Sequence, residues 1–168
     1  NIIHVEGSVD PIRDADIIET ELMLADLESL EKQIDGIAKK AKGDKDLLPL
    51  IELMKKVRDD LNNGIPARKA QVPDDLKKGF KELFLMTSKP VLYVCNVKED
   101  DAEKGNAWTE KAIAMAKAKG SEAVIICAEI ESQIAQLGSE EEKKEFLESL
   151  GLTEPGLNKI IRAGYGLL

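Results

Sequence analysis

The stretches PVLYVCN, residues 90–96, and AVIIC, residues 123–127, decide the fold class of this chain. Each is a run of consecutive apolar residues, and strands without apolar–polar alternation are typical of parallel sheets whose two faces are covered by helices. Residues 107–119, which lie between the runs, are rich in Ala and Lys and predict a helix that ends at Gly120. The order strand, helix, strand predicts an α/β fold with a parallel sheet.

Two further helices are predicted after the second strand. Ser139 and Glu142 form a capping-box pattern, in which each side chain accepts a hydrogen bond from the backbone N–H of the other residue. Glu154-Pro155-Gly156 opens a last helix, because proline is favoured at the start of helices. The apolar face of this last helix is expected to comprise Leu157, Ile160, Ile161 and Tyr165.

The residues before Pro90 have the pattern of paired helices. A long helix is predicted from Asp14 or Asp16, and a turn at Lys42-Gly43-Asp44 ends it. Its apolar residues recur at alternating steps of four and three, as in a heptad seam: Met23, Leu27, Leu30, Ile34, Ile37 and Ala41. A second seam comprises Leu47, Leu50, Met54, Val57 and Leu61. Two seams joined by a tight turn predict an antiparallel helical hairpin with coiled-coil packing.

The second helix of this hairpin has its own signals. Pro49 is compatible with a helix only in the first turn, and Asn62-Asn63-Gly64 is expected to end the helix. A third helix is predicted from Asp74 to about Phe84.

The chain is accordingly expected to have three parts. Residues 1–13 form an extended segment, residues 14–88 a helical insertion, and residues 89–168 half of an α/β domain. Two parallel strands buried on both faces need neighbouring strands, since a two-stranded sheet is marginal alone. The run Ile2–Val5 is the single further strand candidate. We therefore expect these residues to be part of a larger α/β domain.

Composition excludes several classes of protein. The 168 residues are 43% hydrophobic and 33% charged, with a formal net charge of -8. No apolar run approaches the roughly 20 residues of a membrane span, and no signal-peptide pattern occurs. Two cysteines make no disulfide framework, so a reducing, cytoplasmic location is expected. The acidity argues against non-specific binding to nucleic acid, although a local basic patch could bind it.

The candidate chemistry lies at the ends of the two predicted strands. Ligands of open α/β sheets bind beyond the carboxyl ends of strands, which places Asn96-Val97-Lys98-Glu99 and Cys127-Ala128-Glu129 at such a site. The Asn96 amide offers a donor and an acceptor, and the Glu99 carboxylate accepts from ring or exocyclic N–H groups. These groups can frame the edge of a purine. The alternative is an Asn that caps a turn and a solvated surface Glu.

In three long stretches the sequence resembles the YchF, or Obg-like ATPase, family of P-loop GTPase relatives. They are the opening NIIHVEG-VDP-RD (residues 1–14), ELFLMTSKPVLYVCNVKEDD (residues 82–101) and FLESLGLTEPGLNKIIRAGYGLL (residues 146–168). The resemblance implies that the chain is the second half of a P-loop NTPase sheet with an inserted helical hairpin. It also implies that Asn96, Val97 and Glu99 stand at the base-recognition motif, where ordinary GTPases carry N-K-x-D. Cys127, Ala128 and Glu129 then stand at the loop whose backbone meets the base.

The departures from N-K-x-D suggest which base is preferred. Glu99 is one methylene longer than Asp and should crowd the position that the N1–H and 2-amino groups of guanine would use. The resemblance therefore implies that ATP is preferred to GTP, with Val97 contributing backbone and apolar contacts. No G-x-x-x-x-G-K-[ST] loop occurs in the 168 residues. The family's hydrolase activity thus requires a phosphate-binding loop and Mg²⁺ ligands outside these residues. The resemblance also implies a small β-rich domain, called TGS, that is likewise not part of these 168 residues.

Several residues have simpler interpretations. Cys95 and Cys127 lie near the ends of adjacent strands, where redox coupling is conceivable, but small apolar residues are the favoured interpretation. His4 is the single histidine and is read as structural, because no array of metal ligands accompanies it. Trp108 is read as a packing residue.

Lysines gather around the predicted turn of the hairpin. Lys39, Lys40, Lys42 and Lys45 outnumber the nearby carboxylates, against the acidic trend of the chain. An ordinary solvated helix face is one interpretation, and a tip that meets RNA phosphates is the other. The resemblance implies the ribosome or ribosomal RNA as partner, with no membrane, for a monomeric protein. Two function classes follow: part of a ribosome-associated nucleotide hydrolase, or a non-enzymatic helical adaptor on an α/β scaffold.

Overall fold

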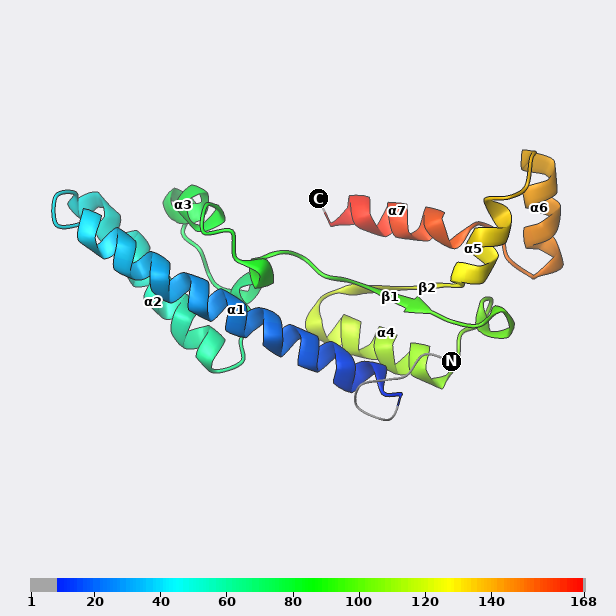
Figure 1. Ribbon diagram of the computed structural model, residues 1–168, viewed down its shortest axis with the longest axis horizontal. Coiled ribbons are helices and arrows are strands. Elements are labelled where there is room, and N and C mark those ends of the chain that lie inside the picture. Colours follow the sequence, from blue (N-terminus) through cyan, green and yellow to red (C-terminus); the bar gives the residue numbers. More distant parts are fainter. Residues whose placement is uncertain (1–8, 168) are drawn as a thin grey trace. The chain divides into compact units, whose positions relative to one another are not determined.

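The computed structural model describes residues 9–167 of the chain (Figure 1). These residues divide into two compact units. The helical unit is Arg13–Pro90, and the α/β unit runs from Val91 onward and includes the described residues before Arg13. The three-part division predicted from the sequence stays a prediction.

The α/β unit is built on two parallel strands, β1 (Leu92–Asn96) and β2 (Glu122–Ile126), paired from Leu92 with Glu122 to Asn96 with Ile126. Helix α4 (Ala107–Lys119) connects them and contacts both strands. Asn106 and Thr109 cap its first turn reciprocally, and Gly120 ends it with a φ of 72°. This positive φ is the left-handed conformation that glycine adopts without strain. The predicted strand–helix–strand order and the end of the helix at Gly120 are confirmed.

The strands are less buried than predicted. The described residues form a sheet of two strands only, and no strand residue reaches the buried class, with Val94 45% exposed. The expectation of burial on both faces is therefore wrong for the described residues, in which α4 and α7 contact a sheet of two strands that no further strand flanks. The third candidate strand, Ile2–Val5, and His4 lie outside the described residues.

Three helices follow β2: α5 (Ala128–Ile134), α6 (Glu140–Ser149) and α7 (Gly156–Gly166). The capping box of α6 is confirmed, since Ser139 Oγ accepts from Glu142 N and Glu142 Oε2 accepts from Ser139 N. The α/β core is a cluster of buried residues from α5, α6 and the loops after the two strands: Ala102, Cys127, Ile130, Ile134 and Leu147.

Helix α7 packs through a different face from the one predicted. Leu157, Ile161 and Tyr165 are exposed, and Ile160 is half-buried. The buried residues of α7 are Gly156 and Ala163, and the helix lies against β2 and β1. Small side chains let the helix approach the sheet closely, which turns the large apolar side chains away. The predicted residues do form an apolar face of α7, but the expectation that this face is the packed one is wrong.

The helical unit contains a long hairpin, made of α1 (Pro11–Lys40) from Arg13 onward and α2 (Leu48–Asn62). Helix α1 starts three residues before the predicted Asp14, because Pro11 fits the first helical position and the Asp10 carboxylate accepts from Ile12 N at 3.1 Å. A turn at residues 41–43 and a 3₁₀ turn, Lys45–Leu47, lead into α2. The predicted place of Pro49 in the first turn and the end of α2 before Gly64 are confirmed.

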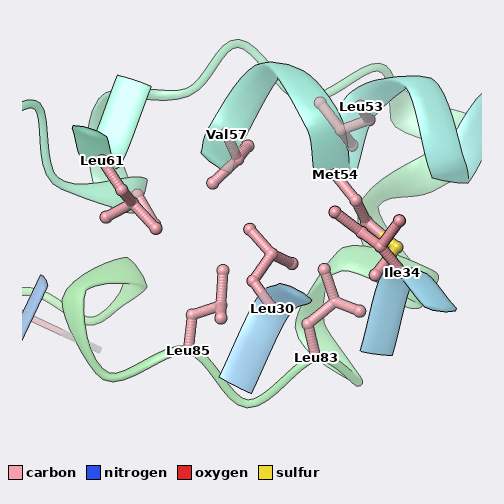
Figure 2. Packing of buried hydrophobic residues seen from close by; sticks show 9 residues of the cluster. Leu30, Ile34, Leu53, Met54, Val57, Leu61, Leu83 and Leu85 are labelled. Carbon is pink, nitrogen blue, oxygen red and sulfur yellow. The ribbon is translucent and has the colours of Figure 1, made fainter. Parts of the chain in front are cut away.

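The core of the helical unit fills the space between α1 and α2 (Figure 2). Leu30 and Ile34 of α1 meet Met54, Val57 and Leu61 of α2, as the two seams predict. The remaining buried members were not predicted from the seams: Leu53, Ala67, Leu83 and Leu85. A third chain segment thus completes the core, and supercoiling of the two helices stays a prediction.

The predicted third helix is shorter than expected. A 3₁₀ turn, Asp74–Leu76, precedes α3 (Lys77–Lys81), which ends before Phe84. The chain instead turns inward at Leu83 and Leu85 and continues into a 3₁₀ turn, Met86–Ser88. The helix from Asp74 to Phe84 is therefore wrong in length, because burying these two leucines requires non-helical backbone.

Polar side chains at seven-residue spacing on α1 hold this third segment. Glu19 pairs with Arg68, and Gln33 Nε2 donates to Leu83 O at 3.1 Å. Between them, buried Asp26 accepts from Met86 N, Thr87 N and Thr87 Oγ1, each at 2.7 Å. Thr87 Oγ1 in turn accepts from Ala67 N at 3.0 Å. One face of α1 therefore supplies hydrogen bonds to a segment that forms only short 3₁₀ turns and irregular backbone.

Candidate functional site at the strand ends

The ends of β1 and β2 lie at the same edge of the sheet. Asn96 is paired with Ile126 in the parallel register, and Val97 N donates to Ile126 O at 2.9 Å. The loop after each strand therefore leaves the sheet at the same place, as the sequence predicts for a ligand site of an α/β fold.

The Asn96 side chain joins the two loops. Its Oδ1 accepts a hydrogen bond from Ala128 N at 3.0 Å, across 32 positions of sequence. Both residues are exposed. Within residues 9–167 the Nδ2 group of Asn96 donates to no protein acceptor, so it remains able to donate to the acceptor edge of a base.

Glu99 stands at the other side of the first loop, as the first residue of a 3₁₀ turn, Glu99–Asp101. Its side chain is exposed, and its carboxylate accepts no hydrogen bond within the described part of the chain. The turn is fixed by its own backbone, since Ala102 N donates to Glu99 O at 3.0 Å and Gly105 N to Asp101 O at 2.7 Å. A rigid turn therefore presents a free carboxylate beside the strand end.

The other predicted site residues divide between surface and core. Ala128 and Glu129 are exposed in the first turn of α5. Cys127 is buried in the α/β core, and Val97 packs against that core with its backbone N–H already used by Ile126. Asn96, Glu99, Ala128 and Glu129 are thus the members of the predicted set whose polar or backbone groups face solvent.

The two cysteines are both free thiols. Burial raises the pKa of the Cys95 thiol above its usual value, which favours the unreactive neutral form. Together with the buried position of Cys127, this agrees with their interpretation as small apolar residues.

Glu131 is a residue that sequence reasoning missed. Its carboxylate accepts from Gly156 N at 2.6 Å and from Leu157 N at 3.2 Å, the first two residues of α7. It thereby ties α5, which follows the second loop of the site, to the start of α7. No local motif marks this residue, because its two partners lie 25 and 26 positions away.

A surface pocket of about 450 Å³ lies beside this contact, and it is lined mainly by α5, α6 and the start of α7. Ile134, Leu147 and Leu157 contribute its apolar lining, and Lys143 and Lys144 its cations. Neither Asn96 nor Glu99 lines it, so the pocket is separate from the strand-end site.

Other predicted features can be placed as well. Lys39, Lys40, Lys42 and Lys45 are exposed around the turn between α1 and α2, and none of them forms an ion pair within residues 9–167. Trp108 is partly exposed in the first turn of α4, with Lys111 Nζ 4.8 Å from its ring centroid. Over the described residues, no group of three His, Cys, Asp or Glu side chains is placed to hold a metal ion. None of the described helices has the length and apolar character that a membrane span requires.

Comparisons with known proteins match the whole chain. It is 44% identical to the protein named ribosome-binding ATPase YchF of Bacillus subtilis over 171 residues, and 43% identical to that of Haemophilus influenzae over 169 residues. Each match covers 100% of this chain and 46% of the relative, so the chain spans about half the length of these relatives. No family model matches the chain.

A solved structure shows the same fold. The Schizosaccharomyces pombe YchF GTPase structure superposes with a TM-score of 0.83 at 31% sequence identity, over all of this chain and 47% of that one. The α/β fold with a small parallel sheet and many helices is thus shared. The resemblance of this chain to the YchF family is confirmed from end to end, over slightly less than half the length of a YchF protein.

Proposed function

We propose that the strand-end site binds the purine base of a nucleotide, ATP in preference to GTP, in a protein that hydrolyses it. The observation that carries the proposal is the hydrogen bond from Ala128 N to Asn96 Oδ1. It joins the two loops and leaves the Asn96 amide N–H groups without a protein acceptor within residues 9–167, so they are available to a ligand. The relatives are named ATPases and the solved structure is titled a GTPase, which supports nucleotide hydrolysis by the whole protein.

The residues present fit a base and not a phosphate chain. Asn96 supplies a donor and Glu99 an acceptor, and both are exposed, Asn96 at the end of β1 and Glu99 at the start of the 3₁₀ turn that follows. The nucleotide supplies the phosphoanhydride that is hydrolysed, and phosphoryl transfer needs a phosphate-binding loop and Mg²⁺. Neither the G-x-x-x-x-G-K-[ST] pattern in the sequence nor a metal-binding cluster in the described residues is present. We assign base recognition to these residues and phosphoryl transfer to others.

The test of base recognition is Glu99→Asp in the protein that contains the phosphate-binding loop. Shortening the side chain by one methylene makes room for the N1–H and 2-amino groups of guanine, so the ratio of ATP to GTP affinity should fall by about tenfold or more. Competition against a fluorescent nucleotide measures both dissociation constants.

Glu145→Asp is the matched control, because Glu145 is also an exposed glutamate but lies in α6, outside the candidate site. It should leave the ratio unchanged. If Glu99→Asp binds both nucleotides as the parent does, Asn96–Glu99 do not read the base, and the helical adaptor becomes the better account.

We further propose that the turn between α1 and α2 contacts ribosomal RNA in the cytoplasm. Support comes from the names of the relatives, which include ribosome binding. It also comes from four exposed lysines without ion-pair partners within residues 9–167: Lys39, Lys40, Lys42 and Lys45. Lysines without carboxylate partners can replace the counterions of phosphates.

Reversing Lys39, Lys40 and Lys42 to Glu should weaken co-sedimentation of the chain with ribosomes by at least about tenfold, since three phosphate contacts become repulsive. The matched control reverses Lys104, Lys117 and Lys144, three exposed lysines of the α/β unit, and makes the same change in net charge. Equal losses in the two variants would show that bulk charge and not the turn is responsible. Undiminished binding of the first variant at low salt would remove the proposal.

A further inference from the structure

Phe84 is exposed in a way that its neighbours are not. Its side chain is 79% exposed, whereas Leu83 and Leu85 on either side are buried in the core of the helical unit. Figure 2 shows these two leucines directed toward Leu30. The segment therefore anchors itself through two leucines and presents the aromatic ring between them to solvent.

The backbone of Phe84 is in a conformation that bulky residues avoid. Its φ is 52°, and it is the one non-glycine residue with a positive φ within residues 9–167. A large side chain in the left-handed region is a genuine outlier. Such strain persists only where the surroundings over-determine it, and it clusters at ligand-binding sites.

Three hydrogen bonds hold this conformation. Phe84 N donates to Lys81 O at 3.2 Å, and Gln33 Nε2 donates to Leu83 O at 3.1 Å. On the other side, Met86 N donates to the buried Asp26 carboxylate at 2.7 Å. The ring is therefore presented from a backbone that is already ordered, which lowers the entropy cost of binding a partner.

The segment that carries Phe84 is positively charged in an otherwise acidic chain. Residues 77–89 contain four lysines and a single acid, Glu82, while the whole chain carries a net charge of -8. All four lysines are exposed: Lys77, Lys78, Lys81 and Lys89. The Lys77–Asp74 pair is solvated and contributes little. Met86, also exposed, adds apolar surface beside the ring. An exposed aromatic ring on a lysine-rich segment is a combination by which proteins bind single strands, in which the ring stacks on a base and the lysines bind phosphates.

We infer that the segment Lys77–Lys89 binds single-stranded RNA, with an unpaired base stacked on Phe84 and neighbouring phosphates held by its lysines. The choice of RNA over DNA rests on the proposed ribosome contact. The inference that this segment binds a single strand does not depend on that contact. The site lies on different residues from the turn between α1 and α2, and it is tested with free RNA.

The experiment compares the full chain with its Phe84→Asn variant. Fluorescence anisotropy measures binding of a labelled oligo(U) of about 12 nucleotides at about 50 mM salt, where phosphate contacts are strong. Loss of one stacked base should weaken binding about tenfold. Asparagine accepts a positive φ far better than phenylalanine, so the variant should melt at the same temperature or higher. Weaker binding then cannot be attributed to unfolding.

Tyr165→Asn is the control, because Tyr165 is an aromatic residue of similar exposure, 76%, in the α/β unit. It should bind oligo(U) as the parent does. Oligo(dT) binding as tight as oligo(U) binding would overturn the choice of RNA, and equally tight binding of an RNA duplex would overturn base stacking. The site is overturned if Phe84→Asn binds like the parent, if the parent fails to bind oligo(U), or if only the Lys39, Lys40 and Lys42 reversal weakens binding. Ribosome co-sedimentation is a separate readout, so the two proposals can fail independently.

Discussion

Replacing Asp26 with alanine is expected to lower the free energy of unfolding of the helical unit by roughly 3–5 kcal/mol. The carboxylate is 2% exposed and accepts three hydrogen bonds, from Met86 N, Thr87 N and Thr87 Oγ1. Hydrogen bonds to a charged group contribute about 1.5–3 kcal/mol each, and the donors left behind stay buried without a partner. Because whole domains are stable by only about 5–15 kcal/mol, this is a large share.

Urea denaturation followed by circular dichroism measures this loss. Asp26→Asn keeps the side-chain volume but removes the charge and turns an N–H₂ group toward donors, so it should be destabilised similarly. That result would separate hydrogen bonding from cavity formation. Asp35→Ala, an exposed aspartate of the same helix, should change stability by less than about 0.5 kcal/mol. A loss below about 1 kcal/mol for Asp26→Ala would contradict the importance of this carboxylate.

The second large effect is expected at Gly156, where α7 approaches β2. A Cβ atom built on Gly156 would lie 2.8 Å from Ile126 Cγ2 and 2.9 Å from Glu131 Oε1, closer than side-chain atoms approach. Gly156→Ala must therefore move α7 away from the sheet and disturb the bonds from Gly156 N and Leu157 N to Glu131. We expect a loss of about 2–3 kcal/mol in the stability of the α/β unit, as for other overpacked sites.

Gly164→Ala is a control with the opposite expected sign. Gly164 belongs to the same helix, and a Cβ built there meets no atom within 4 Å. Alanine in a helix interior is favoured over glycine by about 0.5–1 kcal/mol, so this variant should be more stable than the parent. Thermal or urea unfolding of the pair measures the difference. If Gly156→Ala and Gly164→Ala were equally stable, α7 would not pack against β2 as closely as the position of Gly156 indicates.

Local signals in the sequence predicted the strands and the helix ends, which depend on a few neighbouring residues. The apolar runs at 90–96 and 123–127 located both strands, and Gly120 and Ser139 marked a helix end and a helix start, because capping depends on a few neighbouring residues. The exposed face of α7 was missed, because its orientation depends on how closely Gly156 and Ala163 allow the sheet to approach. Periodicity of apolar residues cannot show this.

The helical unit shows the same limit. Apolar spacing found the seams, but the polar residues Glu19, Asp26 and Gln33 at seven-residue spacing read as ordinary surface positions. Their partners lie about 50 to 60 positions away, in short 3₁₀ turns and the irregular backbone beside them. The buried role of Asp26 therefore becomes visible only in the folded chain.

For the candidate site, the position of Asn96 at a strand end was predictable, because a polar residue closing an apolar run is a local pattern. Its bond to Ala128 was not, since it depends on the register of two strands. Cys127 and Val97 were placed in the site by sequence, but both side chains belong to the α/β core. The alternation of apolar and polar residues along the sequence does not show which side chains of a loop are buried in the core.

The distribution of aromatic residues gives the two units different optical properties. Trp108, Tyr93 and Tyr165 are all the tryptophan and tyrosine of the chain, and all belong to the α/β unit. The helical unit has only phenylalanines, so intrinsic tryptophan emission reports on one unit and is silent about the other. Trp108 is partly exposed with the Lys111 ammonium over its ring, an environment that unfolding would abolish. Emission and far-ultraviolet ellipticity, recorded on one unlabelled sample, can therefore tell which half of this polypeptide melts first.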